Sequence, residues 1–141
     1  MVSLGFLGNS APNAADLNLI AQLTALFVLF IGAYFARSAK FRAHGLFMQS
    51  AIAIQFGAIA LWMIPSLVIN IGAFGTLGFG PVITVWHIFA GFLAVTLAIN
   101  AVFHKELFSL QLRTTMRLTF LIWTSAIFLG IGFYAYYYLL R

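Results

Sequence analysis

The chain has 141 residues, of which 64% are hydrophobic and only 6% are charged. A soluble domain has about 25% charged residues, so the composition excludes a water-soluble globular protein and indicates a chain that lies mainly in lipid. The net charge of +5 does not indicate a nucleic-acid-binding protein, because six of the seven bases fall in two clusters, within residues 37–42 and 104–117.

The start of the chain and its lack of cysteine narrow the possibilities further. Without cysteine there are no disulfides, thiolate zinc sites, iron–sulfur clusters or covalently attached c-type haem. Residues 1–18 have no basic region ahead of an apolar core, so we expect no cleaved signal peptide. The first span is therefore expected to insert uncleaved.

Four apolar segments are long enough to cross a bilayer, which takes about 20 residues of helix. In chain order they are residues 17–36 with Asp16 as the expected cap, residues 43–64 ended by Pro65, residues 82–103, and residues 118–140. Backbone groups in lipid must pair internally, so each span should be helical. The sequence therefore predicts an all-α protein with one domain, an integral membrane four-helix bundle of alternating up and down helices.

The clustered bases predict how this bundle lies in the membrane. Lys and Arg concentrate in cytoplasmic loops, so we expect residues 37–42 and 104–117 to be cytoplasmic, both termini to lie outside, and the protein to reside in the plasma membrane. Aromatic residues near the opposite face are expected to form a belt at the outer interface: Tyr134, Tyr136, Tyr137, Tyr138 and Trp86.

The connection between the second and third spans, residues 65–81, is uncharged, apolar and rich in glycine. An outer loop exposed to water should be polar. Either this segment lies among the lipid headgroups, or another membrane protein covers it, since exposed apolar surface marks interaction sites. In the second case the loop is the expected contact with partner subunits.

Polar side chains within the spans are expected to face the bundle interior or a functional path. His44 and Met48 share one face of the second span. Gln22 lies in the outer part of the first span, and Asn100 in the inner part of the third. Together with Arg117, these two amides are expected to make structural polar contacts.

The depths of the three histidines decide which of them could share a ligand. His87 lies near the outer face, whereas His44 and His104 lie at the inner face, about 25 Å away at ~1.5 Å per residue. Because metal–nitrogen bonds are ~2 Å long, His87 cannot share a metal ion or a haem iron with the other two.

Two separate sites remain open. The inner one would combine His44, Met48 and His104 and would suit copper or haem iron; alternatively both histidines extend to the headgroups and Met48 only packs. At the outer one, His87 is either a single axial ligand of haem b or a hydrogen-bonded contact, expected with Asn18 or Gln22 of the first span or with the tyrosines of the belt.

Catalytic groups are sparse. The two acids, Asp16 and Glu106, fall at opposite faces, so they form no carboxylate pair for acid–base chemistry. The sequence has neither a phosphate-binding glycine motif nor a Ser-His-Asp arrangement within the spans. We therefore predict that the protein is not an enzyme.

Three stretches in this order resemble a known family: 40-KFRAHGLFMQSAI-52, 85-VWHIFAGFLAVTLAIN-100 and 113-RTTMRLTFLIWTSAIFLGIGFYAYYYL-139. Together they are similar to a small four-helix membrane family of unknown function, some of whose members are linked to assembly of haem–copper (cytochrome aa3) oxidase. The resemblance covers about residues 17–139 and implies roles for His44, Met48, His87, Arg117 and Trp123.

The chain departs from the family pattern at one position. The family has a histidine five residues ahead of the arginine that corresponds to Arg117, and here that position is Leu112; His104 lies eight residues earlier. The resemblance therefore implies the fold more strongly than it implies the ligand set.

These observations lead to two functional hypotheses. The first is a non-catalytic accessory subunit or assembly factor of a respiratory or other metal-dependent membrane complex. The alternative is a b-type haem protein of membrane electron transfer, with axial ligands among His44, His87 and His104.

Overall fold

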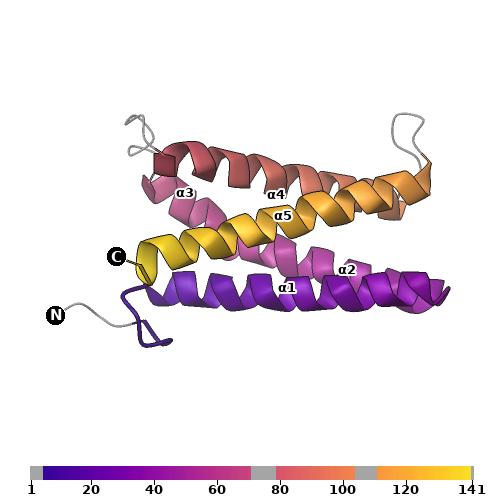
Figure 1. Cartoon of the computed structure of the whole chain (residues 1–141), viewed down its shortest axis with the longest axis horizontal. Coiled ribbons are helices and arrows are strands. Elements are labelled where there is room, and N and C mark those ends of the chain that lie inside the picture. Colours follow the sequence, from indigo (N-terminus) through magenta and orange to yellow (C-terminus); the bar gives the residue numbers. More distant parts are fainter. Residues whose placement is uncertain (1–4, 71–78, 104–110, 141) are drawn as a thin grey trace.

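The structure, a computed structural model, describes residues 5–70, 79–103 and 111–140. Within these ranges the chain is helical and contains no strand, and four of its helical stretches are long and apolar enough to cross a membrane. Figure 1 shows two helical hairpins packed on each other, with both ends of the chain at the same end of the bundle. The predicted all-α, four-helix membrane bundle is confirmed.

The first hairpin begins with α1, Asn13–Arg37, which starts ahead of Asp16 and places that residue in its first turn rather than at its cap. The helix ends in a tight turn in which the amide of Lys40 donates to the carbonyl of Phe35 at 2.9 Å. Ala39 takes the left-handed conformation, φ 55°, at the position where this motif usually has glycine. The turn reverses the chain within a few residues, so the second span packs antiparallel to α1.

The second span continues beyond its predicted end. It consists of α2, Phe41–Ala58, the π-helix η1, Ile59–Met63, and α3, Ile64–Asn70, so it passes through Pro65. A proline ring inside an α-helix clashes with the carbonyl four residues earlier. The π turn, in which the Ile64 amide donates to the Ile59 carbonyl, widens the helix just before Pro65 and removes that conflict.

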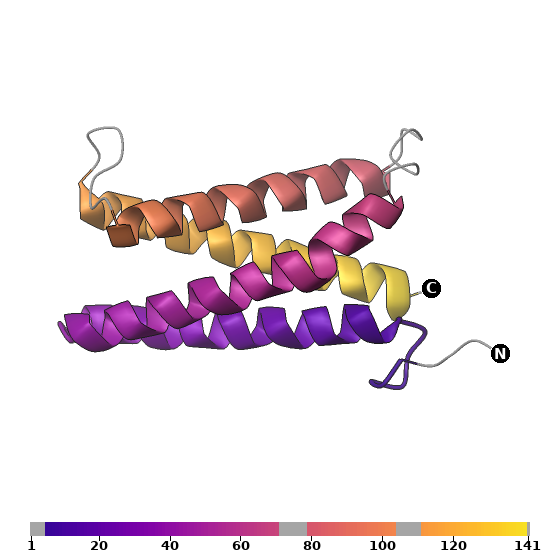
Figure 2. The ribbon, with the colours of Figure 1, turned by 180° about the vertical axis from the view of Figure 1, so that it is seen from behind.

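This π turn also changes the direction of the second span. Figure 2 shows α2 lying along α1 while α3 leaves it and ends beside the start of α4. The connection predicted at residues 65–81 is accordingly helical as far as Asn70 and again from Phe79, and residues 71–78 lie outside the described part of the chain.

The second hairpin consists of α4, Phe79–Phe103, and α5, Leu112–Tyr138. Pro81 falls in the first turn of α4, where the backbone N–H that proline lacks would have no partner within the helix.

The centre of the bundle is built from small residues around a few large ones. The buried core cluster contains Leu29, Ala51, Ala94, Ala98, Trp123 and Ile127. Alanine lets helix backbones approach closely, which drives helix packing in lipid. Large side chains face outward instead, such as Phe92 at 73% exposure, as expected where the solvent is hydrocarbon. This arrangement fixes the positions of the polar side chains described next.

Candidate functional site

His44 of α2 is held against α1. Its Nδ1–H donates to the backbone carbonyl of Gly32 at 2.8 Å. Gly32 is buried, and a Cβ at that position would collide with the terminal methyl of Met48 and lie 3.3 Å from the Cβ of Phe47. His44 and Met48, which the sequence places on one face of the second span, therefore meet the same glycine.

His87 of α4 makes the equivalent contact with α5. Its Nδ1–H donates to the carbonyl of Ala126 at 2.9 Å, and its ring lies edge-on to Phe133. A Cβ on Gly130 would lie 2.9 Å from the ring carbon Cε1. The expected contact with Asn18 or Gln22 of the first span is wrong, because the third span pairs with the fourth through this histidine.

Both hydrogen bonds define the protonation of the rings. A backbone carbonyl only accepts, so Nδ1 must carry the proton in each histidine, and in the neutral ring Nε2 keeps its lone pair. Histidines that ligate metals commonly have this pattern, with the second ring nitrogen fixed on a carbonyl or carboxylate. Each ring could therefore offer one Nε2 ligand without breaking its contact with the neighbouring helix.

The structure keeps these two histidines apart. His44 lies near the turn between α1 and α2, whereas His87 lies toward the end that carries both chain termini. His104 is outside the described residues. Among the residues described, no three His, Asp or Glu side chains come together in a group that could hold a metal ion.

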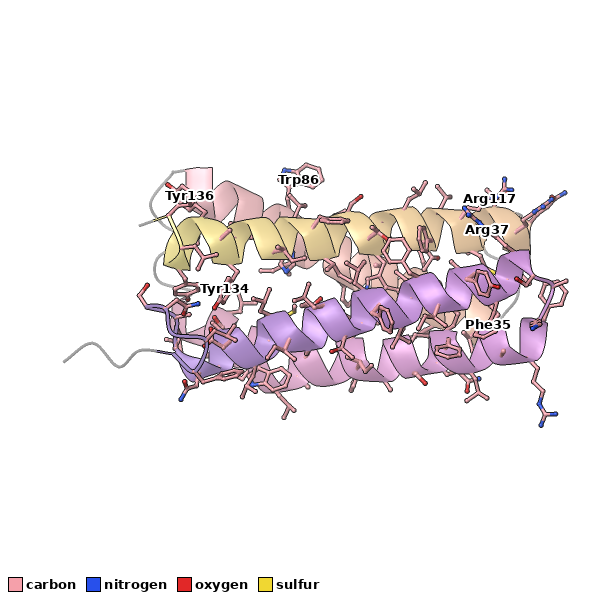
Figure 3. The ribbon with its side chains drawn as sticks, turned by 60° about the horizontal axis from the view of Figure 1, so that its bottom comes forward. Phe35, Arg37, Trp86, Arg117, Tyr134 and Tyr136 are labelled. Atoms are coloured by element: carbon pink, nitrogen blue, oxygen red, sulfur yellow. The ribbon has the colours of Figure 1, made fainter. Side chains whose placement is uncertain are left out.

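The remaining predicted residues differ in their burial and in their hydrogen-bond partners. Gln22 is buried, at 4% exposure, and its Nε2 has no hydrogen-bond partner in the described structure; the same holds for Oδ1 of Asn100. Arg117 is exposed on α5, at the same end of the bundle as Arg37 (Figure 3). Of the residues that the resemblance implicates, Trp123 is buried and donates from Nε1 to Oε1 of Gln55 at 3.4 Å.

A polar cluster that the sequence did not predict lies at the end of the bundle that carries the termini. Tyr134, expected in an interfacial belt, is 9% exposed, and its hydroxyl donates to Oδ1 of the fully buried Asp16. The spacing of these residues could have indicated that Tyr134 is buried, since Trp123, Ile127 and Tyr134 lie on one face of a single helix. Its neighbours Tyr136 and Tyr137 do face outward, as predicted.

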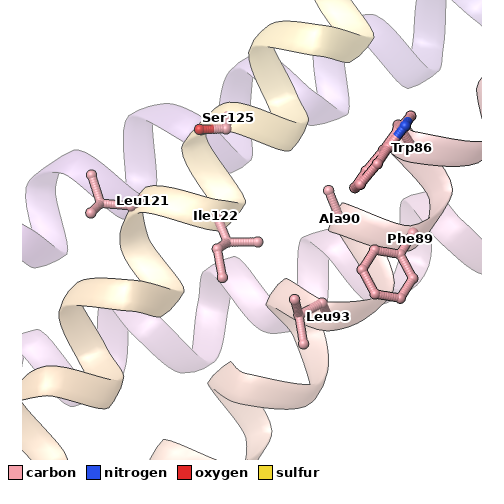
Figure 4. Close-up of a pocket in the computed structure, with 7 residues that line it drawn as sticks. All are labelled: Trp86, Phe89, Ala90, Leu93, Leu121, Ile122 and Ser125. Carbon is pink, nitrogen blue, oxygen red and sulfur yellow. The ribbon is translucent and has the colours of Figure 1, made fainter. Parts of the chain in front are cut away.

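The surface also carries a groove between α4 and α5. Trp86, Phe89, Ala90 and Leu93 line it from α4, and Leu121, Ile122 and Ser125 line it from α5 (Figure 4). Its volume is about 300 Å³. Trp86 and Phe89 form one wall with their rings perpendicular, and the small side chains of Ala90 and Ser125 leave the space between the helices open.

Comparison with known proteins identifies no relative: no family model, no curated protein and no solved structure matches the chain. The features that bear on function are therefore the geometry of the two histidines, the polar core and the groove.

Proposed function

We propose that the protein is a non-catalytic accessory subunit or assembly factor of a haem- or metal-containing membrane complex, such as a respiratory oxidase. The observation that carries this proposal is the groove between α4 and α5. Helices in lipid associate by close packing at small residues, since lipid itself is as apolar as a partner helix. Ala90 and Ser125, set between Trp86 and Leu121, form a shallow hollow that would accept side chains from a transmembrane helix of another subunit.

The end of α3 offers a second apolar surface, which either lipid or the same partner would cover. Ile64, Val68 and Ile69 are exposed, Ile69 at 80%. Val68 and Ile69 fall within the uncharged segment 65–81, which is expected either to lie among the lipid headgroups or to be covered by another membrane protein. A partner that fills the groove and packs on the end of α3 would cover both apolar surfaces.

The proposed setting is the plasma membrane, with the basic connections 37–42 and 104–117 in the cytoplasm and both termini outside. Arg37 and Arg117 lie at one end of the bundle, opposite the chain ends (Figure 3). The positive-inside rule assigns that end to the cytoplasm.

Filling the groove tests the proposal. Tagged protein would be extracted in mild detergent and resolved on native gels. Ala90→Trp places an indole in the hollow and should detach the chain from its complex. Phe92→Trp is the matched control, because Phe92 lies on α4 outside the groove lining and is exposed. Equal migration of both variants with the complex would contradict a role for the groove.

The two histidines support b-type haem binding as a second candidate function. Each ring offers one Nε2 while its Nδ1–H stays on a carbonyl. His44 and His87 lie too far apart to ligate one iron, so each would need a second axial ligand from another residue or another subunit. A dithionite-reduced spectrum of the isolated chain and of the purified complex tests this: a b-type α-band from the isolated chain would favour the haem hypothesis, and a b-type band of the complex that neither His44→Ala nor His87→Ala alters would remove it.

Copper is the third chemistry that this chain could support, since imidazole and thioether are suitable copper(I) ligands. His44 and Met48 meet at Gly32. Copper bound per chain should fall in His44→Ala and in Met48→Leu. A stoichiometry that neither substitution alters would remove this site.

A further inference from the structure

The N-terminal loop, residues 5–11, folds back on the start of α1. The Gly8 amide donates to the Gly5 carbonyl at 2.9 Å, and the Gly5 amide donates to the Asn9 carbonyl at 2.8 Å. Gly8 has φ 77°, a conformation that glycine adopts without strain. The Oδ1 of Asn9 accepts from the Ala11 amide at 2.9 Å. The loop is thus a closed turn that leads into α1.

A buried carboxylate fastens this loop to the bundle. Oδ2 of Asp16 accepts from the Leu7 amide at 3.0 Å, and Oδ1 accepts from the hydroxyl of Tyr134 on α5. The same hydroxyl accepts from Nδ2 of Asn9 at 2.6 Å. Asp16 and Tyr134 therefore connect three parts of the chain: the loop, α1 and α5.

Both carboxyl oxygens of Asp16 accept a hydrogen bond in this cluster. Asp16 is fully buried, and none of the described residues forms an ion pair with it. A buried charge is costly unless hydrogen bonds compensate for the lost water, and here two donors and the positive end of α1 do so. Asp16 is thus an acceptor at both oxygens, a role that an amide cannot fill.

Gly5 shows how closely the loop is fitted to this carboxylate. A Cβ at Gly5 would lie 2.6 Å from Oδ2 of Asp16. Any side chain there would push the loop away from the carboxylate. The tight approach leaves little freedom in the orientation of the next two residues.

Those residues are apolar and face outward. Phe6 is 57% exposed and Leu7 is 46% exposed, in a loop that has no charged side chain. The loop lies beside the first turn of α1, at the end of the bundle where the spanning helix begins (Figure 1). Exposed aromatic and aliphatic side chains at this level of a membrane protein meet the boundary between headgroups and acyl chains.

We propose that the N-terminal loop is an interfacial membrane anchor, in which Asp16 and Tyr134 hold the backbone so that Phe6 and Leu7 enter the lipid leaflet next to α1. The partner is the bilayer surface. The proposal depends on the membrane-spanning bundle and on the cluster around Asp16, and not on the accessory-subunit function.

The absence of native cysteine makes a direct test possible. Leu7→Cys gives a single thiol in the loop while the backbone amide that contacts Asp16 remains, and an environment-sensitive nitrobenzoxadiazole dye would be attached to it. The labelled protein is reconstituted into phosphatidylcholine vesicles. Quenching by lipids that carry a nitroxide near the headgroup is then compared with quenching by aqueous iodide.

The anchor predicts strong quenching by the shallow nitroxide and weak quenching by iodide. Asp16→Asn turns an amide NH₂ toward one of the two donors, so that hydrogen bond is lost. The loop should then detach from the bundle, and iodide quenching of the dye should rise several-fold. Tyr134→Phe should act in the same direction and is the milder substitution. Tyr34→Phe, an exposed tyrosine near the other end of α1, is the matched control and should change nothing.

Two results would overturn the proposal. If iodide quenches the dye freely in the otherwise unaltered protein, the loop is not in the lipid. If the dye stays shielded in Asp16→Asn, Tyr134→Phe and Gly5→Ala alike, the cluster around Asp16 does not position it.

Discussion

Gly130 is the position where the structure gives the sharpest expectation for a single substitution. In Gly130→Ala the new Cβ would lie 2.9 Å from Cε1 of His87, closer than side-chain carbons approach, so the ring or α5 must move. Moving the ring breaks the hydrogen bond to Ala126, and such a bond between membrane helices contributes about 0.6–1.7 kcal/mol. Overpacking adds about 1–3 kcal/mol, against roughly 1 kcal/mol gained when alanine replaces a helical glycine.

The balance is a net loss of about 1–4 kcal/mol, which is at least roughly 5-fold in the unfolding equilibrium. Gly132→Ala is the matched control, since it lies on the same helix and its Cβ would meet nothing within 4 Å. Unfolding of each variant would be followed by far-ultraviolet circular dichroism as dodecyl sulfate is added to mixed micelles.

A double-mutant cycle separates this mechanism from a general effect on α5. In a His87→Ala background the ring is absent, so Gly130→Ala should lose its cost and resemble Gly132→Ala. The predicted collision with His87 is refuted if Gly130→Ala is as stable as Gly132→Ala in the native background, or if its cost persists without the imidazole.

Three further substitutions test other contacts by the same unfolding assay. Trp123→Phe leaves Oε1 of Gln55 without its donor and should cost about 1–3 kcal/mol; adding Gln55→Leu should recover part of that loss, and no recovery would argue against the Trp123–Gln55 contact. Ala39→Gly should stabilise the protein by about 1 kcal/mol, because it removes a left-handed alanine from the α1–α2 turn; a loss of stability would contradict that turn. Gly32→Ala should destabilise the α1–α2 contact through Met48 and Phe47, whereas Gly45→Ala, which faces open space, should not; equal effects would show that the helices are not in close contact at Gly32.

The number and type of helices were predictable because hydrocarbon thickness sets a minimum length for an apolar segment. The end of the second span could not be predicted in this way, because the rule that proline ends a helix assumes a regular α-helix before the proline. A π turn at Ile59–Met63 relieves the clash, and no simple residue pattern specifies that turn.

The contacts of the candidate site were less predictable than the spans. His87 is near an end of its helix, as the depth argument indicates, but its partner depends on which helices are neighbours, and span lengths do not determine that. Tyr134 was assigned to the interface by its depth and its neighbours. It is buried because the N-terminal loop and Asp16 cover it, a contact between residues more than a hundred positions apart.

The most direct test of the proposed accessory role is the mass of the particle that contains this chain after extraction in a mild detergent. Size-exclusion chromatography with light scattering, corrected for detergent, measures that mass. An accessory subunit should elute in a particle several times heavier than the 15.5 kDa of one chain, together with other membrane subunits and a haem or metal spectrum. A homogeneous particle of 15.5 kDa protein mass, extracted from native membranes without any partner, would contradict it.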